Sequence, residues 1–199
     1  MQISNGVICA LDETDKNLII PKHVTGADYF VADLALVQGF DSITVDKDNR
    51  FFIVRDGCLI MRDQKILIAA ANGAKIPDDG SVTSIAPGAF MFRDDLDTIQ
   101  IPSQIKTIGY CAFANTSLKA VVIKEGLQSL DCFAFAFNDD LKELFLPKSL
   151  QTITNHPLLE EVPFLVNEGY KKTLYKVYKD SCAHRWAIDK KLRYALRGE

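Results

Sequence analysis

The sequence predicts a strand-rich solenoid, in which the chain winds into stacked coils around one apolar interior. Three observations support this prediction. An apolar pattern recurs about every 22 residues in the second half of the chain, a longer repeat with turn motifs occupies the first eighty residues, and the last thirty residues follow neither pattern. Units that recur in this way cannot bury their apolar side alone, so they stack and share a continuous core.

The regular repeat lies between Val82 and Val162. Each unit opens with an apolar residue, continues with an Ala-Phe pair, and ends in a Leu-x-x-Ile-x-Ile type segment whose alternating residues predict an inward-facing strand. The first residues of successive units are 23, 22 and 23 positions apart, at Ile85, Ile108, Leu130 and Ile153. This period falls within the roughly 20–29 residues of leucine-rich repeats. Stacking then predicts a buried column of Phe90, Phe113 and Phe135. The fourth unit lacks the Ala-Phe pair and resumes at Leu159-x-x-Val162.

The first eighty residues contain two β-hairpin motifs. Asn5-Gly6 and Asp56-Gly57 each separate two apolar runs, and their glycines are 51 residues apart. Such pairs supply the positive φ angles that a two-residue hairpin turn requires. Short apolar runs at 18–20, 43–45 and 66–68 predict further strands, so this part is expected to continue the solenoid with hairpins inserted into its coils.

The last thirty residues predict a closing unit. Residues 174–178 suit a strand, Ser181 suits a helix N-cap, residues 182–191 suit a short helix, and residues 192–196 suit a final strand. An end coil needs a cover for its core. Trp186 is therefore expected to pack on the last coil near Leu159 and Val162.

These elements define the predicted class and its organisation. The class is α/β but strand-rich: a right-handed leucine-rich-repeat solenoid with a parallel β ladder, N-terminal β-hairpin insertions and a C-terminal helical cap. Residues 1–169 form the solenoid, with divergent hairpin-bearing units over 1–80 and regular repeats over 81–164, and residues 170–199 form the cap unit.

The composition is that of an ordinary globular protein. The 199 residues carry a net charge of −3 and are 48% hydrophobic. No apolar run is long enough to cross a membrane, and the N-terminus does not resemble a signal peptide. The five scattered cysteines suit buried thiols in a reducing compartment. The sequence therefore predicts a cytoplasmic protein, with secretion or display on the cell surface as the alternative.

No set of residues predicts catalysis, a cofactor or a metal site. His23, His156 and His184 are far apart in sequence and in repeat register, and no nucleophile shares a coil position with them. The Asp94-Asp95 and Asp139-Asp140 pairs precede strands, where turn residues are expected, and their spacing does not fit a calcium loop. We therefore expect no enzyme.

The motifs resemble those of a known family. The pattern IPxxVTxIxxxAFxxxxxLxxIxIP, taken from Ile76 to Pro102, resembles the BspA-like (bacterial surface antigen type) leucine-rich repeats. ITVDKDNRFFIVRDGCLIMRDQKILIAA resembles a hairpin insertion of that family, and VYKDSCAHRWAIDKKLRY resembles its closing segment. The resemblance covers roughly residues 40–199 and implies recognition of proteins or host surfaces. The sequence departs from the family at Arg93, Thr116 and Asn138, near its usual inward Cys.

The expected function is binding of a protein partner through the exposed ladder face. Alternate residues of each strand point outward, and Gln100, Val122 and Phe145 should form one row. The predicted partner-binding residues are Thr98, Gln100, Val122, Glu143 and Phe145. Two alternatives stay open. One is binding of an anion or nucleic acid by residues 170–199, which carry nine Lys/Arg against three Asp/Glu; the other is self-assembly into a weak homo-oligomer.

Overall fold

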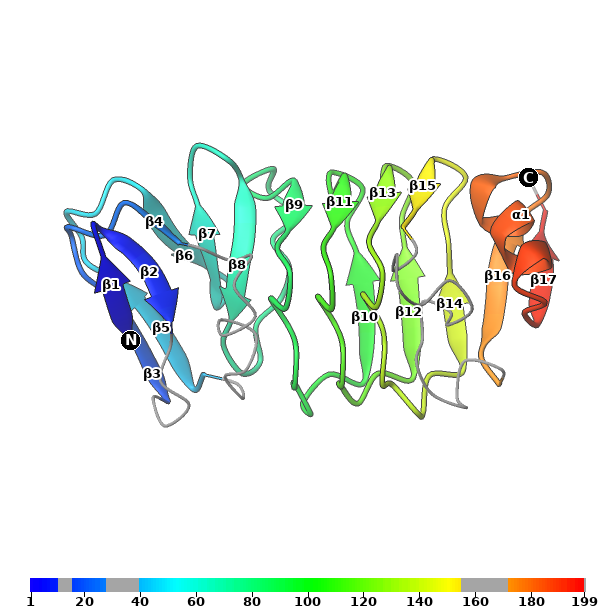
Figure 1. Cartoon of the computed structure of the whole chain (residues 1–199), viewed down its shortest axis with the longest axis horizontal. Coiled ribbons are helices and arrows are strands. Elements are labelled where there is room, and N and C mark those ends of the chain that lie inside the picture. Colours follow the sequence, from blue (N-terminus) through cyan, green and yellow to red (C-terminus); the bar gives the residue numbers. More distant parts are fainter. Residues whose placement is uncertain (11–15, 28–39, 155–171, 199) are drawn as a thin grey trace.

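The computed structural model describes residues 1–10, 16–27, 40–154 and 172–198. Over most of these residues the chain forms a row of coils with β ladders on two sides (Figure 1). The long-strand ladder consists, in order, of β10 (Thr98–Ile101), β12 (Ala120–Ile123), β14 (Glu143–Phe145), β16 (Leu174–Tyr178) and β17 (Tyr194–Arg197). All of its neighbouring strands are parallel. The expected solenoid with parallel ladders is therefore present.

The short-strand ladder runs along the other side of the coils. It consists of β15 (Thr152–Ile153), β13 (Ser129–Leu130), β11 (Thr107–Ile108), β9 (Ser84–Ile85), β8 (Ile66–Ala70), β7 (Cys58–Met61) and β6 (Phe52–Arg55). Its register aligns Ile85, Ile108, Leu130 and Ile153. These residues open the four units of the sequence repeat, so one sequence period corresponds to one step of the ladder.

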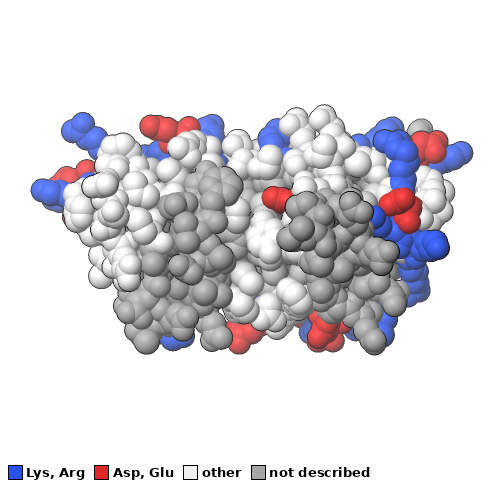
Figure 2. All heavy atoms as spheres, viewed as in Figure 1, with Lys and Arg blue, Asp and Glu red and all other residues white. Residues whose placement is uncertain are grey.

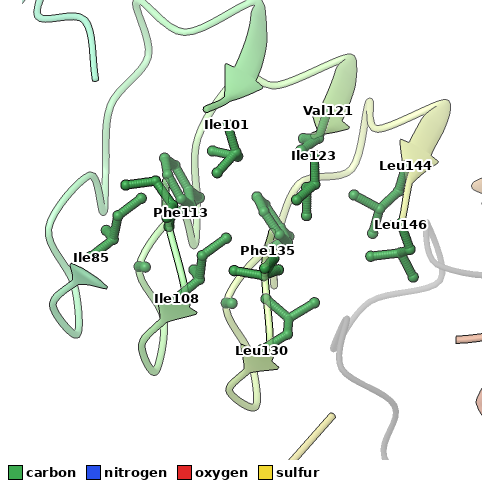
Figure 3. Packing of buried hydrophobic residues seen from close by; sticks show 14 of the residues in the cluster. Ile85, Ile101, Ile108, Phe113, Val121, Ile123, Leu130, Phe135, Leu144 and Leu146 are labelled. Atoms are coloured by element: carbon green, nitrogen blue, oxygen red, sulfur yellow. The ribbon is translucent and has the colours of Figure 1, made fainter. Parts of the chain in front are cut away.

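An aromatic column fills the interior between the two ladders. The ring centroids of Phe90 and Phe113 are 4.9 Å apart, those of Phe113 and Phe135 are 5.2 Å apart, and both pairs are stacked. All three side chains are fully buried. Figure 3 shows Phe113 and Phe135 between the inward aliphatic side chains of the two ladders. The predicted column is confirmed.

Three polar residues occupy equivalent places beside this column. Asn138 donates hydrogen bonds to the carbonyls of Phe113 and Phe135, and its Oδ1 accepts from the backbone N–H of Thr116. Arg93 is 2% exposed and donates to the Ala70 carbonyl of the preceding coil at 3.0 Å. A buried polar group is tolerated when it is hydrogen-bonded. The departures from the family pattern therefore link neighbouring coils.

Antiparallel strand pairs lie at both predicted hairpins. β1 (Gln2–Ser4) pairs with β2 (Val7–Ala10), and β6 pairs with β7. Between β6 and β7, Asp56 and Gly57 have φ angles of 48° and 78°. A Cβ on Gly57 would lie 3.0 Å from the Ala74 Cβ, so the turn also needs glycine for space.

The N-terminal coils have a hydrophobic cluster of their own. The strands β3 (Asn17–Ile20) and β5 (Ser42–Val45) are parallel, and β4 (Gly26–Ala27) pairs with β2. The cluster includes Ile20, Phe40 and Phe52, whereas the aromatic column belongs to the larger cluster. Buried Asn49 donates to the Pro21 and Val24 carbonyls, which ties these coils together.

The closing unit has the predicted strand–helix–strand order. After β16, Ser181 caps the helix α1 (Cys182–Asp189) by accepting a hydrogen bond from the His184 N–H at 3.1 Å. The chain then returns to the ladder as β17, beside α1 at one end of the row (Figure 1). Trp186 is 8% exposed and makes an edge contact with Tyr175.

The expected position of the fourth long strand is wrong. The strand that pairs directly with β14 is β16, whose Leu174 lies beside Glu143. The place beside β14 that the repeat spacing gave to Leu159-x-x-Val162 is therefore taken by β16. Residues 155–171, including the predicted neighbours of Trp186, lie outside the described residues. The segment lacks the Ala-Phe pair that anchors the other units.

Candidate functional site

The outward side chains of the long-strand ladder form two parallel rows. Gln100 lies beside Val122, and Val122 lies beside Phe145. In the second row, Thr98 and Glu143 lie on either side of Ala120. All five predicted residues thus lie on one face of three neighbouring strands, and the predicted continuous row is confirmed.

The rows change in character along the ladder. Thr98 and Gln100 on β10 are exposed, whereas Val122, Glu143 and Phe145 are half-buried. A half-buried aromatic ring with polar neighbours is a typical anchor of a protein interface, because it offers apolar area and is already held in place. The apolar end of the rows lies on β12 and β14.

Two cations lie over the Phe145 ring. Lys176, its neighbour on β16, places Nζ 4.4 Å from the ring centroid and 2.9 Å from the Glu143 carboxylate. The Arg197 guanidinium of β17 lies 5.4 Å from the Phe145 centroid and 5.0 Å from that of Tyr178. Such cation–aromatic contacts stabilise a surface cluster by about 0.5–1 kcal/mol each. We call Glu143, Phe145, Lys176, Tyr178 and Arg197 the cation–aromatic cluster.

Sequence reasoning missed the last three members of this cluster. Phe145 is more than thirty positions from each of them in sequence, so no local motif links them to it. The ladder brings them together by pairing β14 with β16 and β16 with β17. The available signal for the cluster was the alternation of Lys176 and Tyr178 on a predicted strand. That signal could be interpreted only with the knowledge that this strand pairs with β14.

A groove lies at the beginning of the strands β14 and β16. It has a volume of about 480 Å³ and is lined by Asp139, Asp140, Leu141, Lys142, Glu143, Lys172, Leu174 and Arg193. Its lining contains three acidic and three basic residues, so it does not select one sign of charge. Glu143 belongs to both the groove and the outward rows.

The sequence pattern described as the BspA type leucine rich repeat region matches this chain in 6 copies over residues 71–164. The match covers the regular coils and every residue of the two outward rows. Residues 71–164 belong to the BspA-type leucine-rich repeat family. No protein among those of curated function matches the sequence significantly.

Solved structures support the same fold for almost the whole chain. The pneumococcal vaccine antigen PcpA matches with a TM-score of 0.63 at 16% identity, over 92% of this chain and 56% of that one. A leucine-rich cell surface protein from Faecalibacterium prausnitzii matches with a TM-score of 0.62 at 18% identity, over 92% of this chain and 48% of that one. The chain thus spans about half the length of these two proteins. At such identities the likeness shows the fold.

Three buried cysteines, Cys58, Cys111 and Cys132, have thiols with raised pKa values. Burial raises the pKa of the Cys58 thiol to about 12 and those of Cys111 and Cys132 to about 11. A thiol with such a pKa is protonated at neutral pH and is a poor nucleophile and metal ligand. In the part of the chain that the structure describes, no three His, Cys, Asp or Glu residues lie close enough to hold a metal ion.

Two of the polar residues considered in the sequence, His184 and Asp95, have structural partners. His184 is buried, its Nδ1 accepts from the Asp180 N–H at 3.0 Å, and its ring contacts Tyr194. Asp95 accepts from the Arg93 guanidinium, which lowers the pKa of this carboxyl group. Among the residues that the structure describes, no helix is long and apolar enough to cross a membrane.

Proposed function

We propose that this chain is a non-catalytic module that binds a protein partner through the outward face of the long-strand ladder. The proposed contact residues are Thr98, Gln100, Val122, Glu143 and Phe145. The observation that supports this most strongly is the continuous row of Gln100, Val122 and Phe145 across three parallel strands. Such a row presents polar and apolar groups at regular spacing on a rigid support.

Phe145 is the proposed anchor of the interface. Its ring is held by Lys176 on one side and approached by Arg197, so little side-chain freedom remains to be lost when a partner binds. Ordering a free side chain on binding costs about 0.5–1.5 kcal/mol, and a pre-ordered side chain avoids part of that cost. Thr98 and Gln100 would then form a polar rim that hydrogen-bonds at the edge of the contact.

The cell surface is the proposed setting. The two proteins with the matching fold are described as a vaccine antigen and a cell surface protein. This favours the surface alternative over the cytoplasmic one that the sequence suggested. Free thiols in buried positions are compatible with either setting, because burial protects them from reagents.

The test is a crosslinking pull-down from lysate and surface extract of the source organism. The bait variant Val122→Thr/Phe145→Ser should lose the captured protein and keep its melting temperature within a few degrees. Phe137→Ser is the matched control, because Phe137 is an exposed aromatic residue, at 46% of its surface, outside both rows. Undiminished capture by the double variant would move the site off this face. Equal loss with the control would show non-specific apolar capture.

A further inference from the structure

The strand β17 is an edge of the long-strand ladder among the described residues. It is the last strand of the long-strand ladder, and within the described residues it pairs only with β16 (Figure 1). Its register sets Tyr194 beside Tyr175, Leu196 beside Val177, and Arg197 beside Tyr178. An edge of this kind can accept a further strand, because its outer backbone groups have no ladder partner.

The backbone groups that face outward can be assigned. The Tyr175 N–H donates to the Arg193 carbonyl at 3.0 Å, so Arg193 turns its peptide groups towards β16. Residues of a parallel strand direct their N–H and C=O groups alternately to the two sides. Ala195 and Arg197 therefore also face β16, and the N–H and C=O groups of Tyr194 and Leu196 face the open side.

Two side chains of β17 are exposed, although their neighbours on β16 are buried. Tyr175 and Val177 on β16 are 0% exposed, yet their neighbours Tyr194 and Leu196 on β17 are 39% and 51% exposed. A further strand would place its inward side chains against these two residues. Burial of these apolar side chains would stabilise the association by about 25 cal/mol per Å² of apolar area.

The other face of the same edge is basic. Arg197 points outward, contacts the rings of Phe145 and Tyr178, and has no carboxylate within ion-pair distance among the described residues. Lys and Arg side chains gather at the end of the molecule that carries β16, α1 and β17 (Figure 2). An acidic side chain on an added strand would lie beside Arg197, and opposite charges across strands stabilise pairing.

We propose that the β17 edge binds an extended segment of another protein as an added parallel strand, in which acidic residues alternate with apolar ones. The apolar set covers Tyr194 and Leu196, and the acidic set lies on the side of Arg197. This surface is the end of the ladder, so the proposal does not depend on binding at the outward rows.

The test uses a fluorescein-labelled octapeptide of alternating Glu and Val, followed by fluorescence polarisation. In a parallel strand added to β17, the Glu residues turn their N–H groups towards β17 and the Val residues turn theirs to solvent, as Ala195 and Leu196 do relative to β16. N-methylation of the Glu amides should weaken binding roughly tenfold or more, since several hydrogen bonds are lost. N-methylation of the Val amides should leave binding nearly unchanged. Equal effects of the two methylations would overturn strand addition.

Two variants test the side-chain part of the proposal. Arg197→Gln should weaken the Glu-Val peptide about threefold, whereas Arg50→Gln, an exposed arginine far along the chain, should not. An alternating Lys-Val peptide should bind more weakly than the Glu-Val peptide. On binding, hydrogen exchange of the Tyr194 and Leu196 amides should slow, while that of Lys142, directly before β14, should not change. Self-association that the peptide cannot compete away would overturn the proposal, because a second copy would then occupy the edge.

Discussion

The Asn138 side-chain amide donates to the carbonyl oxygen of Phe113 at 2.8 Å, although the two residues belong to different coils. The same amide donates to the Phe135 carbonyl, also at 2.8 Å, and its oxygen accepts from the Thr116 N–H at 2.9 Å. One side chain thus satisfies three backbone groups beside the aromatic column. Since backbone groups left unpaired in a core are costly, this residue should stabilise the stack more than its size suggests.

Replacement of Asn138 by Leu should lower the free energy of unfolding by about 2–3 kcal/mol, because the amide's backbone partners lose their hydrogen bonds. Urea denaturation followed by circular dichroism measures this. Gln128→Leu is the control, since Gln128 is exposed in the preceding turn and should change stability by less than about 0.5 kcal/mol. An unchanged free energy of unfolding in the Asn138→Leu variant would mean that water or a backbone shift replaces the hydrogen bonds of the amide.

Phe113→Ala should cost about 3–5 kcal/mol of stability, because it removes a ring that stacks on two others in a fully buried column. Thermal and urea unfolding both report this loss. Phe137→Ala, at an exposed aromatic position, serves as the comparison. An unchanged melting temperature in the Phe113 variant would contradict the column.

Stability should fall in alkaline solution through the buried thiols. Burial raises the pKa of the Cys58 thiol from 9.0 to about 12. The same thiol donates a hydrogen bond to the Lys75 carbonyl. The unfolded chain therefore releases this proton first, and the stabilisation present below pH 9 is lost as the pH rises towards 12. The expected loss is about 1 kcal/mol between pH 9 and pH 10 for this thiol. The slope of stability against pH should be shallower in Cys58→Ala, and an identical slope would contradict the assignment.

Truncation after Val166 should expose the core and promote aggregation. It removes β16, α1 and β17, and so uncovers one edge of β14 and the buried Leu144 and Leu146. Light scattering and dye binding to apolar surface detect the change. A truncated chain that stays soluble and melts cooperatively would identify the closing unit as an appendage.

The regular coils could be predicted from the sequence because each repeat position has one physical role. The inward residues Val121 and Ile123 alternate with outward ones as a strand requires, and Phe113 occupies a recurring position where a large ring can fill the interior. The hairpin turns could also be predicted, since Asp56-Gly57 needs positive φ angles. These signals are local.

The neighbour of β14 could not be predicted in this way. Spacing placed Leu159–Val162 next in the ladder, but strand pairing depends on contacts between segments distant in sequence, and Leu174–Tyr178 takes that place. For the same reason the five proposed site residues could be aligned, whereas their contact with Lys176 and Arg197 could not be foreseen.

The parallel ladders have a consequence for how such a chain can change in evolution. Among the described residues, the Phe113 ring stacks on the rings of the coils before and after it, and the backbone of its coil bonds to those same two neighbours. Duplication of one whole unit therefore inserts a coil without altering any other contact, and it lengthens the outward rows by one strand spacing of about 4.8 Å. Insertion of one residue within a strand would instead shift the inward side chains that follow it to the outer face. The number of coils can thus change in whole units while the packing within each coil stays the same.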